Sequence, residues 1–205
     1  MRAGKPSVDM TRRIEAILLS LSLVLLSACA GTITKTVPAA ASETRPVVLL
    51  DHGRHASLVL TRADQNLVRY LYGDWRWYAE NDTGPLRAIP TLFARTPSAL
   101  GRREMSGPAS SEALRRQVPV HIDQIHWLSA DAARIDALDR RLSTYFEGRL
   151  DERLFNPVYE LEFVPGPRPY TLFDNSNHII AEWLEELGIE VRGNPIFGRW
   201  RVEAH

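Results

Sequence analysis

Ser176 is the side chain whose type and position best suit covalent chemistry. It lies in the stretch YTLFDNSNHII, where an apolar strand pattern gives way to a helical pattern. Several enzyme families place a nucleophile at such a strand-to-helix junction. Asp174, Asn175 and Ser176 are also residue types that cap helices. The sequence therefore predicts either a nucleophile or a helix cap at this position.

Histidines gather in a second short stretch, DHGRHASLVL. His52 and His55 flank a glycine turn at the head of an expected strand, and His178 could approach them if the last helix packs on the first strands. Three such imidazoles could bind zinc. In the alternative interpretation they only cap and hydrogen-bond, and the sequence contains no H-E-x-x-H motif. We therefore expect neither a metal nor another cofactor.

An aromatic group, DWRWY, follows the third expected strand. Trp75, Trp77 and Tyr78 stand beside turn residues and could line a groove for a peptidoglycan sugar or an acyl chain. Aromatic residues in such a place can instead close a core over a long loop. Burial of these three side chains would favour a structural envelope protein without a ligand cleft.

The N-terminal residues predict a secreted and lipid-anchored protein. Arg12 and Arg13 precede a short apolar run, IEAILLSLSLVLL, which is followed by LSAC ending at Cys29. This pattern resembles a bacterial lipobox, in which the cysteine is acylated and becomes the new N-terminus. The alternatives are an ordinary signal peptide or a short membrane anchor, although the run is shorter than the ~20 residues of a spanning helix.

These features divide the chain into three parts. We expect a lipoprotein signal peptide at 1–28, an acylated Cys29 with a flexible tether at 29–45, and one domain at 46–205. Cys29 is the only cysteine, so its acylation would leave no free thiol. No aspartate follows it, a pattern typical of sorting to the periplasmic face of the outer membrane.

Composition limits the class of partner. Lys plus Arg and Asp plus Glu both total 25, so the formal net charge is zero and nucleic acid is not an expected partner. The expected partners are the bilayer, through acylated Cys29, and either peptidoglycan or another envelope protein.

The elements that would position these residues indicate an α+β fold. Apolar runs predict a meander of strands at 47–50, 56–60 and 67–72 and further strands at 118–128, 158–164 and 170–173. Helical periodicity predicts helices at 129–147 and 176–187, each followed by glycine. Between residues 86 and 104, prolines permit only short helical pieces.

Four motifs, in order along the domain, resemble those of an uncharacterised bacterial family encoded in urease gene regions. They are H-G-x-H-x-x-L-V-L from His52, Y-G-D with aromatics from Tyr72, P-S-A-L from Pro97, and Y-x-L-F-x-N-x-N from Tyr170. That family is similar to the circularly permuted branch of the NlpC-like, papain-like superfamily, relatives of lecithin retinol acyltransferase. The likeness implies a permuted papain-like domain with an antiparallel sheet and packed helices.

The resemblance also implies roles for individual residues. His55 would be the general base, residue 176 the nucleophile, and Asp74 the carboxylate that holds the imidazole. Asn175 and Asn177 flank the nucleophile, and with the aromatic group they are candidates for substrate binding.

Two residues depart from the family pattern. The family has cysteine where this chain has Ser176, and an acidic residue where it has Arg69. A thiol at a helix N-terminus can ionise, whereas a hydroxyl needs an oriented base, and a nearby arginine lowers the pKa of an imidazole. We therefore expect an inactive domain that acts in binding or scaffolding. The alternative is a serine-type amidase, peptidase or acyltransferase acting on cell-wall or lipid substrates.

Overall fold

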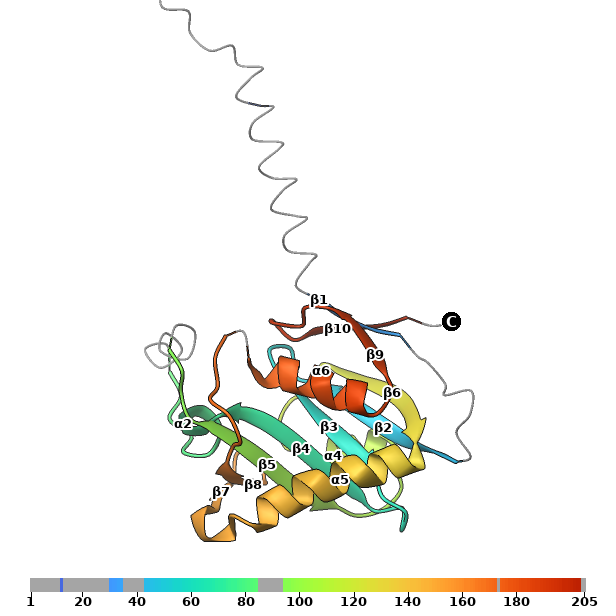
Figure 1. The fold of residues 1–205 in the computed structure, drawn as a ribbon, viewed down its shortest axis with the longest axis horizontal. Coiled ribbons are helices and arrows are strands. Elements are labelled where there is room, and N and C mark those ends of the chain that lie inside the picture. The colour runs from blue at the N-terminus through green and yellow to red at the C-terminus, as the bar shows by residue number, and fades with distance from the viewer. Residues whose placement is uncertain (1–11, 13–29, 35–42, 85–93, 173, 204–205) are drawn as a thin grey trace, which may run out of the picture.

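A computed structural model describes residues 12, 30–34, 43–84, 94–172 and 174–203 of the chain (Figure 1). The expected signal peptide, apart from Arg12, and the expected acylation site Cys29 lie outside these described residues. Within the described part of the chain, no helix is long and apolar enough to cross a membrane.

The core of the fold is an antiparallel sheet, here called the main sheet, of order β6-β2-β3-β4-β5-β8-β7. Its strands are β2 (Thr44–Asp51), β3 (Ala56–Thr61), β4 (Leu67–Asp74), β5 (Ser98–Met105), β6 (Gln124–Asp131), β7 (Leu154–Asn156) and β8 (Leu161–Pro165). The predicted meander of the first three strands is confirmed, because β2, β3 and β4 are neighbours in the sheet.

A second sheet, here called the small sheet, joins the two ends of the described chain. Its order is β10-β1-β9, with β1 (Ala30–Thr34) parallel to β10 (Arg199–Glu203) and antiparallel to β9 (Glu190–Gly193). The helices are α2 (Trp75–Tyr78), α4 (Ser111–Gln117), α5 (Ala132–Glu147), the 3-10 turn η1 (Leu150–Glu152) and α6 (Ser176–Glu186).

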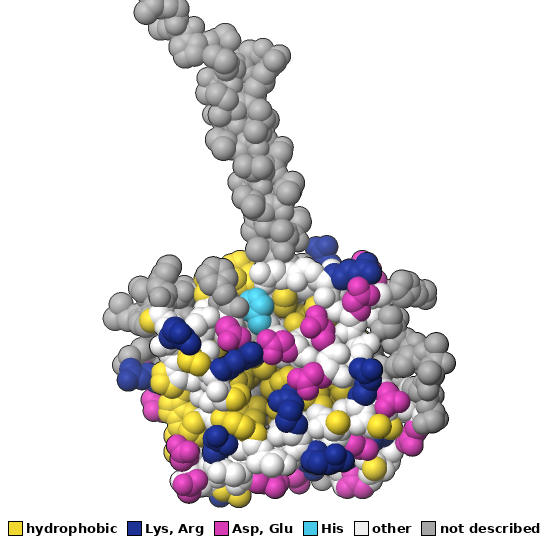
Figure 2. Space-filling view, in the orientation of Figure 1, with side chains coloured by type: hydrophobic (Ala, Val, Ile, Leu, Met, Phe, Trp, Pro, Cys, Tyr) yellow, Lys and Arg dark blue, Asp and Glu magenta, His cyan; other side chains and the backbone are white. Residues whose placement is uncertain are grey.

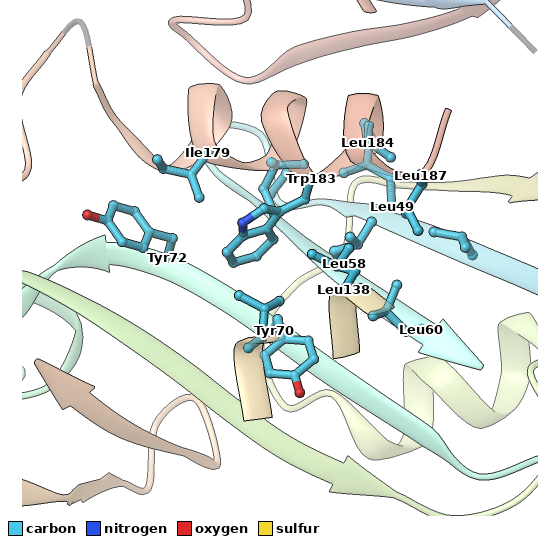
Figure 3. Packing of buried hydrophobic residues seen from close by; sticks show 14 of the residues in the cluster. Leu49, Leu58, Leu60, Tyr70, Tyr72, Leu138, Ile179, Trp183, Leu184 and Leu187 are labelled. Atoms are coloured by element: carbon cyan, nitrogen blue, oxygen red, sulfur yellow. The ribbon is translucent and has the colours of Figure 1, made fainter. Parts of the chain in front are cut away.

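Apolar burial arranges these elements in layers. Helices α5 and α6 lie on one face of the main sheet, and the small sheet lies beside α6 (Figure 1). The largest buried cluster joins all of them, and Figure 3 shows Trp183 and Leu184 of α6 above Leu58 of β3 and Tyr70 of β4. Two smaller clusters on the opposite face pack against α4 and α2.

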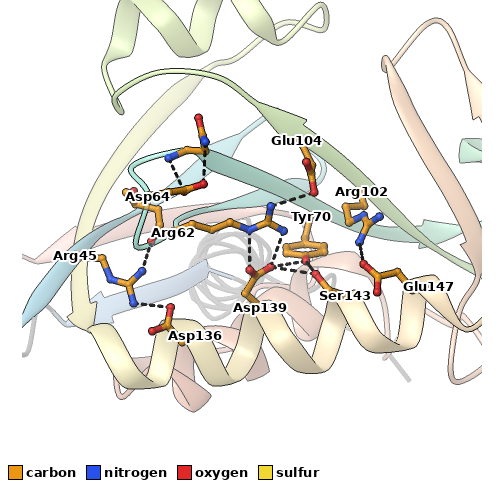
Figure 4. A network of polar contacts seen from close by, with 12 residues as sticks. Arg45, Arg62, Asp64, Tyr70, Arg102, Glu104, Asp136, Asp139, Ser143 and Glu147 are labelled. Atoms are coloured by element: carbon orange, nitrogen blue, oxygen red, sulfur yellow. Dashed lines mark hydrogen bonds and ion pairs between the residues drawn. The ribbon is translucent and has the colours of Figure 1, made fainter.

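Helix α5 forms where its apolar residues recur at helical spacing. Ile135, Leu138, Leu142 and Phe146 are buried on one side of it, and the Asp131 side chain accepts a hydrogen bond from the backbone N–H of the third helical residue. On its polar side Asp139 accepts from the Tyr70 hydroxyl at 2.6 Å (Figure 4). Arg62, in the turn after β3, pairs with the same carboxylate (Figure 4).

The predicted α+β class is confirmed, and several predicted boundaries are wrong. Residues 98–104, where only short helical pieces were expected, belong to β5, and residues 118–123 precede β6 instead of belonging to it. Residues 129–131 belong to β6, so the helix there begins at Ala132. Tyr170 and Thr171 make isolated bridges and no strand.

The expected tether at 29–45 is wrong for its two described ends. Ala30–Thr34 form β1, with Ile33 fully buried and backbone pairing to strands on both sides. Thr44 and Arg45 already belong to β2. Residues 35–42 of the expected tether lie outside the described part of the chain.

Candidate functional site

Asn175, and not Ser176, caps helix α6. Its Oδ1 accepts hydrogen bonds from the backbone N–H groups of Asn177 at 2.9 Å and His178 at 3.3 Å. Its Nδ2 donates to the carbonyl oxygens of Leu172 at 3.0 Å and Ile196 at 2.9 Å. The amide therefore fixes the start of α6 to two neighbouring loops, and Ser176 is the first helical residue.

Ser176 is almost fully buried, with 2% of its surface exposed. Hydrogen bonds from its side chain and backbone to the Tyr170 phenol act to lower the pKa of that phenol. Burial has the larger effect and raises the pKa of Tyr170 to about 12, so the phenol is neutral at physiological pH. The sequence reasoning missed Tyr170, although it stands in the same motif as Ser176.

His55 lies just before β3, close to the start of α6. The Asn177 side chain donates to the Arg54 carbonyl oxygen at 3.1 Å, which joins the two segments. The His55 ring stacks on His52 at 4.8 Å and meets the Tyr78 ring edge at 5.4 Å. Its Nε2 is buried without a hydrogen-bond partner, and no hydrogen bond joins His55 to Ser176 within the described residues.

Arg69 of β4 is fully buried beside these histidines, with 0% of its surface exposed. Its Nε donates to the Ser57 Oγ at 3.0 Å, and its Nη2 lies 3.4 Å from the His52 Nε2. Its Nη1 has no hydrogen-bond partner. No carboxylate pairs with this guanidinium in the part of the chain that the structure describes.

The hydrogen bonds of His52 determine its tautomer. Its Nδ1 lies 2.7 Å from the carbonyl oxygen of His121, which can only accept, so Nδ1 carries the proton. Its Nε2 is therefore free to accept a hydrogen bond from the Ser57 Oγ, 3.0 Å away. Ser57 thus links the imidazole of His52 to the guanidinium of Arg69.

Burial and the nearby cation keep both imidazoles neutral. Burial, and after it the charge of Arg69, lowers the pKa of His52 to about 4. The pKa of His55 lies well below its ordinary value because of burial, His52 and Arg69, so the effect predicted for this arginine is confirmed. Burial and the nearby Arg103 lower the pKa of Arg69 itself to about 9.

Asp74 does not hydrogen-bond to His55 in the described structure. One of its carboxylate oxygens accepts from the backbone N–H of Trp77 at 2.9 Å and so caps α2. The other accepts from the Thr96 hydroxyl. Both oxygens of the carboxylate expected to orient the imidazole are therefore engaged elsewhere.

The aromatic group is partly core and partly surface. Tyr78 is buried and packs on Tyr159 and Phe163, whereas Trp75 and Trp77 are half-buried against the same cluster. Gly73 permits this packing, because a Cβ atom there would lie 2.1 Å from the Tyr78 ring. This arrangement favours the core interpretation for Tyr78 and leaves open the groove interpretation for the tryptophans.

The histidines do not converge. The His178 ring contacts the side-chain oxygens of Asn175 at 3.0 Å and Asn194 at 2.7 Å, not His52 or His55. The described residues contain no group of three or more His, Cys, Asp or Glu able to hold a metal ion. A surface pocket beside Arg102 and Phe155 is not lined by any residue of the candidate site.

Ser176, His55 and Asp74 thus form no hydrogen-bonded relay among the described residues. The chain matches no protein-family model, no curated protein and no solved structure.

Proposed function

We propose that this chain is a lipid-anchored envelope protein whose permuted papain-like domain binds or scaffolds and does not catalyse. One observation carries the proposal: among the described residues, no hydrogen bond joins His55 to Ser176 or to Asp74. Ser176 hydrogen-bonds to Tyr170, Asp74 caps α2, and the buried Nε2 of His55 has no hydrogen-bond partner.

The physical chemistry of serine nucleophiles supports this proposal. A hydroxyl attacks only when an oriented base takes its proton in the transition state, which leaves the base positively charged. An imidazolium at His55 would be buried next to Arg69, and both burial and that cation oppose the charge.

The alternative is a serine-type amidase, peptidase or acyltransferase. The hydrogen bond from Asn177 to the Arg54 carbonyl oxygen favours it, because it holds the start of α6 beside the turn that contains His55. A neutral His55 also has the protonation state that a general base needs.

A serine-reactive fluorophosphonate probe separates the two functions. On our proposal the purified full chain is not modified at Ser176, as mass spectrometry would show. Ser111 is the matched control site, because it is the first residue of α4, following the N-cap Ser110, but is exposed. Labelling at Ser176 that disappears in the His55→Ala variant would establish the serine enzyme instead.

The anchor has a separate test. On our proposal Cys29→Ala moves the protein from the membrane fraction to the soluble fraction, because the paired acyl chains that hold it are lost. Retention of this variant in the membrane fraction would contradict acylation of Cys29.

A further inference from the structure

Strand β1 fixes where an acyl chain on Cys29 would stand relative to the domain. Cys29 directly precedes Ala30, the first residue of β1, and consecutive Cα atoms are ~3.8 Å apart. Ala30 pairs with Arg199 of β10, and Gly31 pairs with Gly193 of β9. A bilayer holding Cys29 therefore meets the domain at this end of the small sheet, without a spacer.

The charge on the outer face of the small sheet changes from positive to negative along β1. Inward-facing Trp200 and Val202 pack on the main core, while the alternate residues of β10 are exposed. Moving away from Cys29, the register places Arg199 beside Ala30, Arg201 and Arg192 beside Thr32, and Glu203 and Glu190 beside Thr34. The cationic end is thus the end next to Cys29, and the acidic end is remote from it.

Not all of these charges are paired with one another. Arg192 pairs with Glu190 at 2.7 Å. Arg199 and Arg201 form no ion pair with an acidic residue of the described chain. Figure 2 shows basic side chains, with acidic ones beside them, at the edge of the molecule where the small sheet lies.

A large exposed aromatic residue stands at the same end. Phe197 precedes β10 by two residues, and 54% of its surface is exposed. Its loop is held in place, because Asn194 contacts His178 at 2.7 Å and the Ile196 carbonyl oxygen accepts from Asn175 at 2.9 Å. Exposure of this ring is therefore a property of an ordered loop.

We propose that the Cys29 end of the small sheet, formed by Phe197, Arg199 and Arg201, lies against the surface of a bilayer that contains anionic phospholipid. The inference rests on the proposed acylation of Cys29. The phenyl ring enters the interfacial region, and the guanidinium groups meet the phosphates, where juxtamembrane basic residues are attracted. The acidic end, at Glu190 and Glu203, points away from like charge on the membrane.

The orientation is measurable on the full, processed chain in vesicles. Phe197→Trp introduces a reporter at the proposed face, and Phe155→Trp introduces a matched one on edge strand β7, where the phenylalanine is 61% exposed. Vesicles contain phosphatidylglycerol and phosphatidylcholine with or without brominated acyl chains. The fluorescence added by Trp at position 197 should be quenched by bromine, and that added at 155 should not. Replacing Arg199 and Arg201 by Gln should reduce the quenching at 197, whereas Arg116→Gln with Arg140→Gln should not.

Mass spectrometry of the same samples shows whether Cys29 is acylated, and so distinguishes a wrong orientation from a missing anchor. Equal quenching at the two positions, or none at 197 on an acylated protein, would overturn the orientation alone. An unmodified Cys29 would overturn the anchor and the orientation together.

Discussion

At the scale of single residues, Arg69 has the least favourable surroundings of the charged groups near the candidate site. It is fully buried, lacks a carboxylate partner in the described chain and leaves Nη1 without a hydrogen bond. Replacing even a buried ion pair by apolar residues of similar volume is often neutral or stabilising by about 1–4 kcal/mol, and the Arg69 charge has no such partner among the described residues. We therefore expect Arg69→Met to raise the free energy of unfolding in urea by about 1–3 kcal/mol.

The matched variant Arg69→Ala removes the same charge but leaves a cavity. It should be less stable than Arg69→Met. If the methionine variant is as destabilised as the alanine variant, the cation contributes contacts that outweigh its burial.

His52 predicts a pH dependence of stability. Above pH 6.5 its imidazole is neutral in both the folded and the unfolded chain, and below it the unfolded chain binds the proton first, because the folded pKa is about 4. Stability should therefore fall as pH falls from 6.5 to 4, by up to about 3 kcal/mol from this residue at about 1.4 kcal/mol per pKa unit.

Urea unfolding across this pH range tests whether His52 causes the fall in stability. His52→Asn should make the fall less steep, whereas His121→Gln, at an exposed side chain, should leave it unchanged. An equal slope in wild type and His52→Asn would mean that other groups cause the acid sensitivity.

Ser176→Cys introduces a thiol at the position where our proposal places the nucleophile of a papain-like relative. On our proposal the new thiol is alkylated slowly at neutral pH and rapidly only after unfolding, because position 176 is 2% exposed and makes no hydrogen bond to His55. Ser111→Cys, at the equivalent position of α4, should react without unfolding. Fast alkylation at 176 with a thiol pKa below 7 would instead indicate an intact catalytic frame.

Individual residues of the site were predictable to different degrees. The influence of Arg69 on the pKa of His55 was expected from the resemblance, in which an acidic residue stands at the position of this arginine. The engagement of Asp74 with Thr96 did not, since it depends on how the segment before β5 returns to the end of β4. The contact between Ser176 and Tyr170 likewise depends on the turn before α6.

At the scale of elements, helix α6 depends on one capping amide. Asn175→Ala should lower the free energy of unfolding by about 1–2 kcal/mol for the cap alone, and by more because two loop hydrogen bonds are lost as well. Asn175→Asp keeps the cap oxygen and should lose less. Ser110→Ala, which removes only the α4 cap, is the control, and a loss as large as that of Asn175→Ala would contradict this role.

A regular spacing of apolar residues made some helices and strands predictable, and strands without it were missed. The helical spacing of α5 and α6 and the apolar runs of β2, β3 and β4 identified those elements. Strand β5 was missed because Arg102, Arg103 and Glu104 interrupt its apolar pattern, and these side chains are held by Glu147, Glu160 and Arg62 on other elements. Strand β1 was missed because its threonines resemble a linker until β9 and β10 pair with it.

At the scale of the whole molecule, β1 unites strands that otherwise do not touch in the small sheet. Deleting residues 1–34 removes the fully buried Ile33, and a side chain of that size contributes about 1.5–3 kcal/mol through burial. We expect this deletion to lower stability and to remove hydrogen-exchange protection from β9 and β10. Deleting only residues 1–29 is the control and should preserve both, and unchanged protection in the longer deletion would show that β1 is dispensable.

The pairing of β1 with β9 and β10 also has a consequence for the order of events during synthesis. The strand that is translated first in the described domain finds its partners only among the strands translated last. Contacts this remote in sequence form late, because the whole intervening chain must close into a loop. The small sheet can therefore be completed only after the last residues of β10, up to Glu203, have been translated.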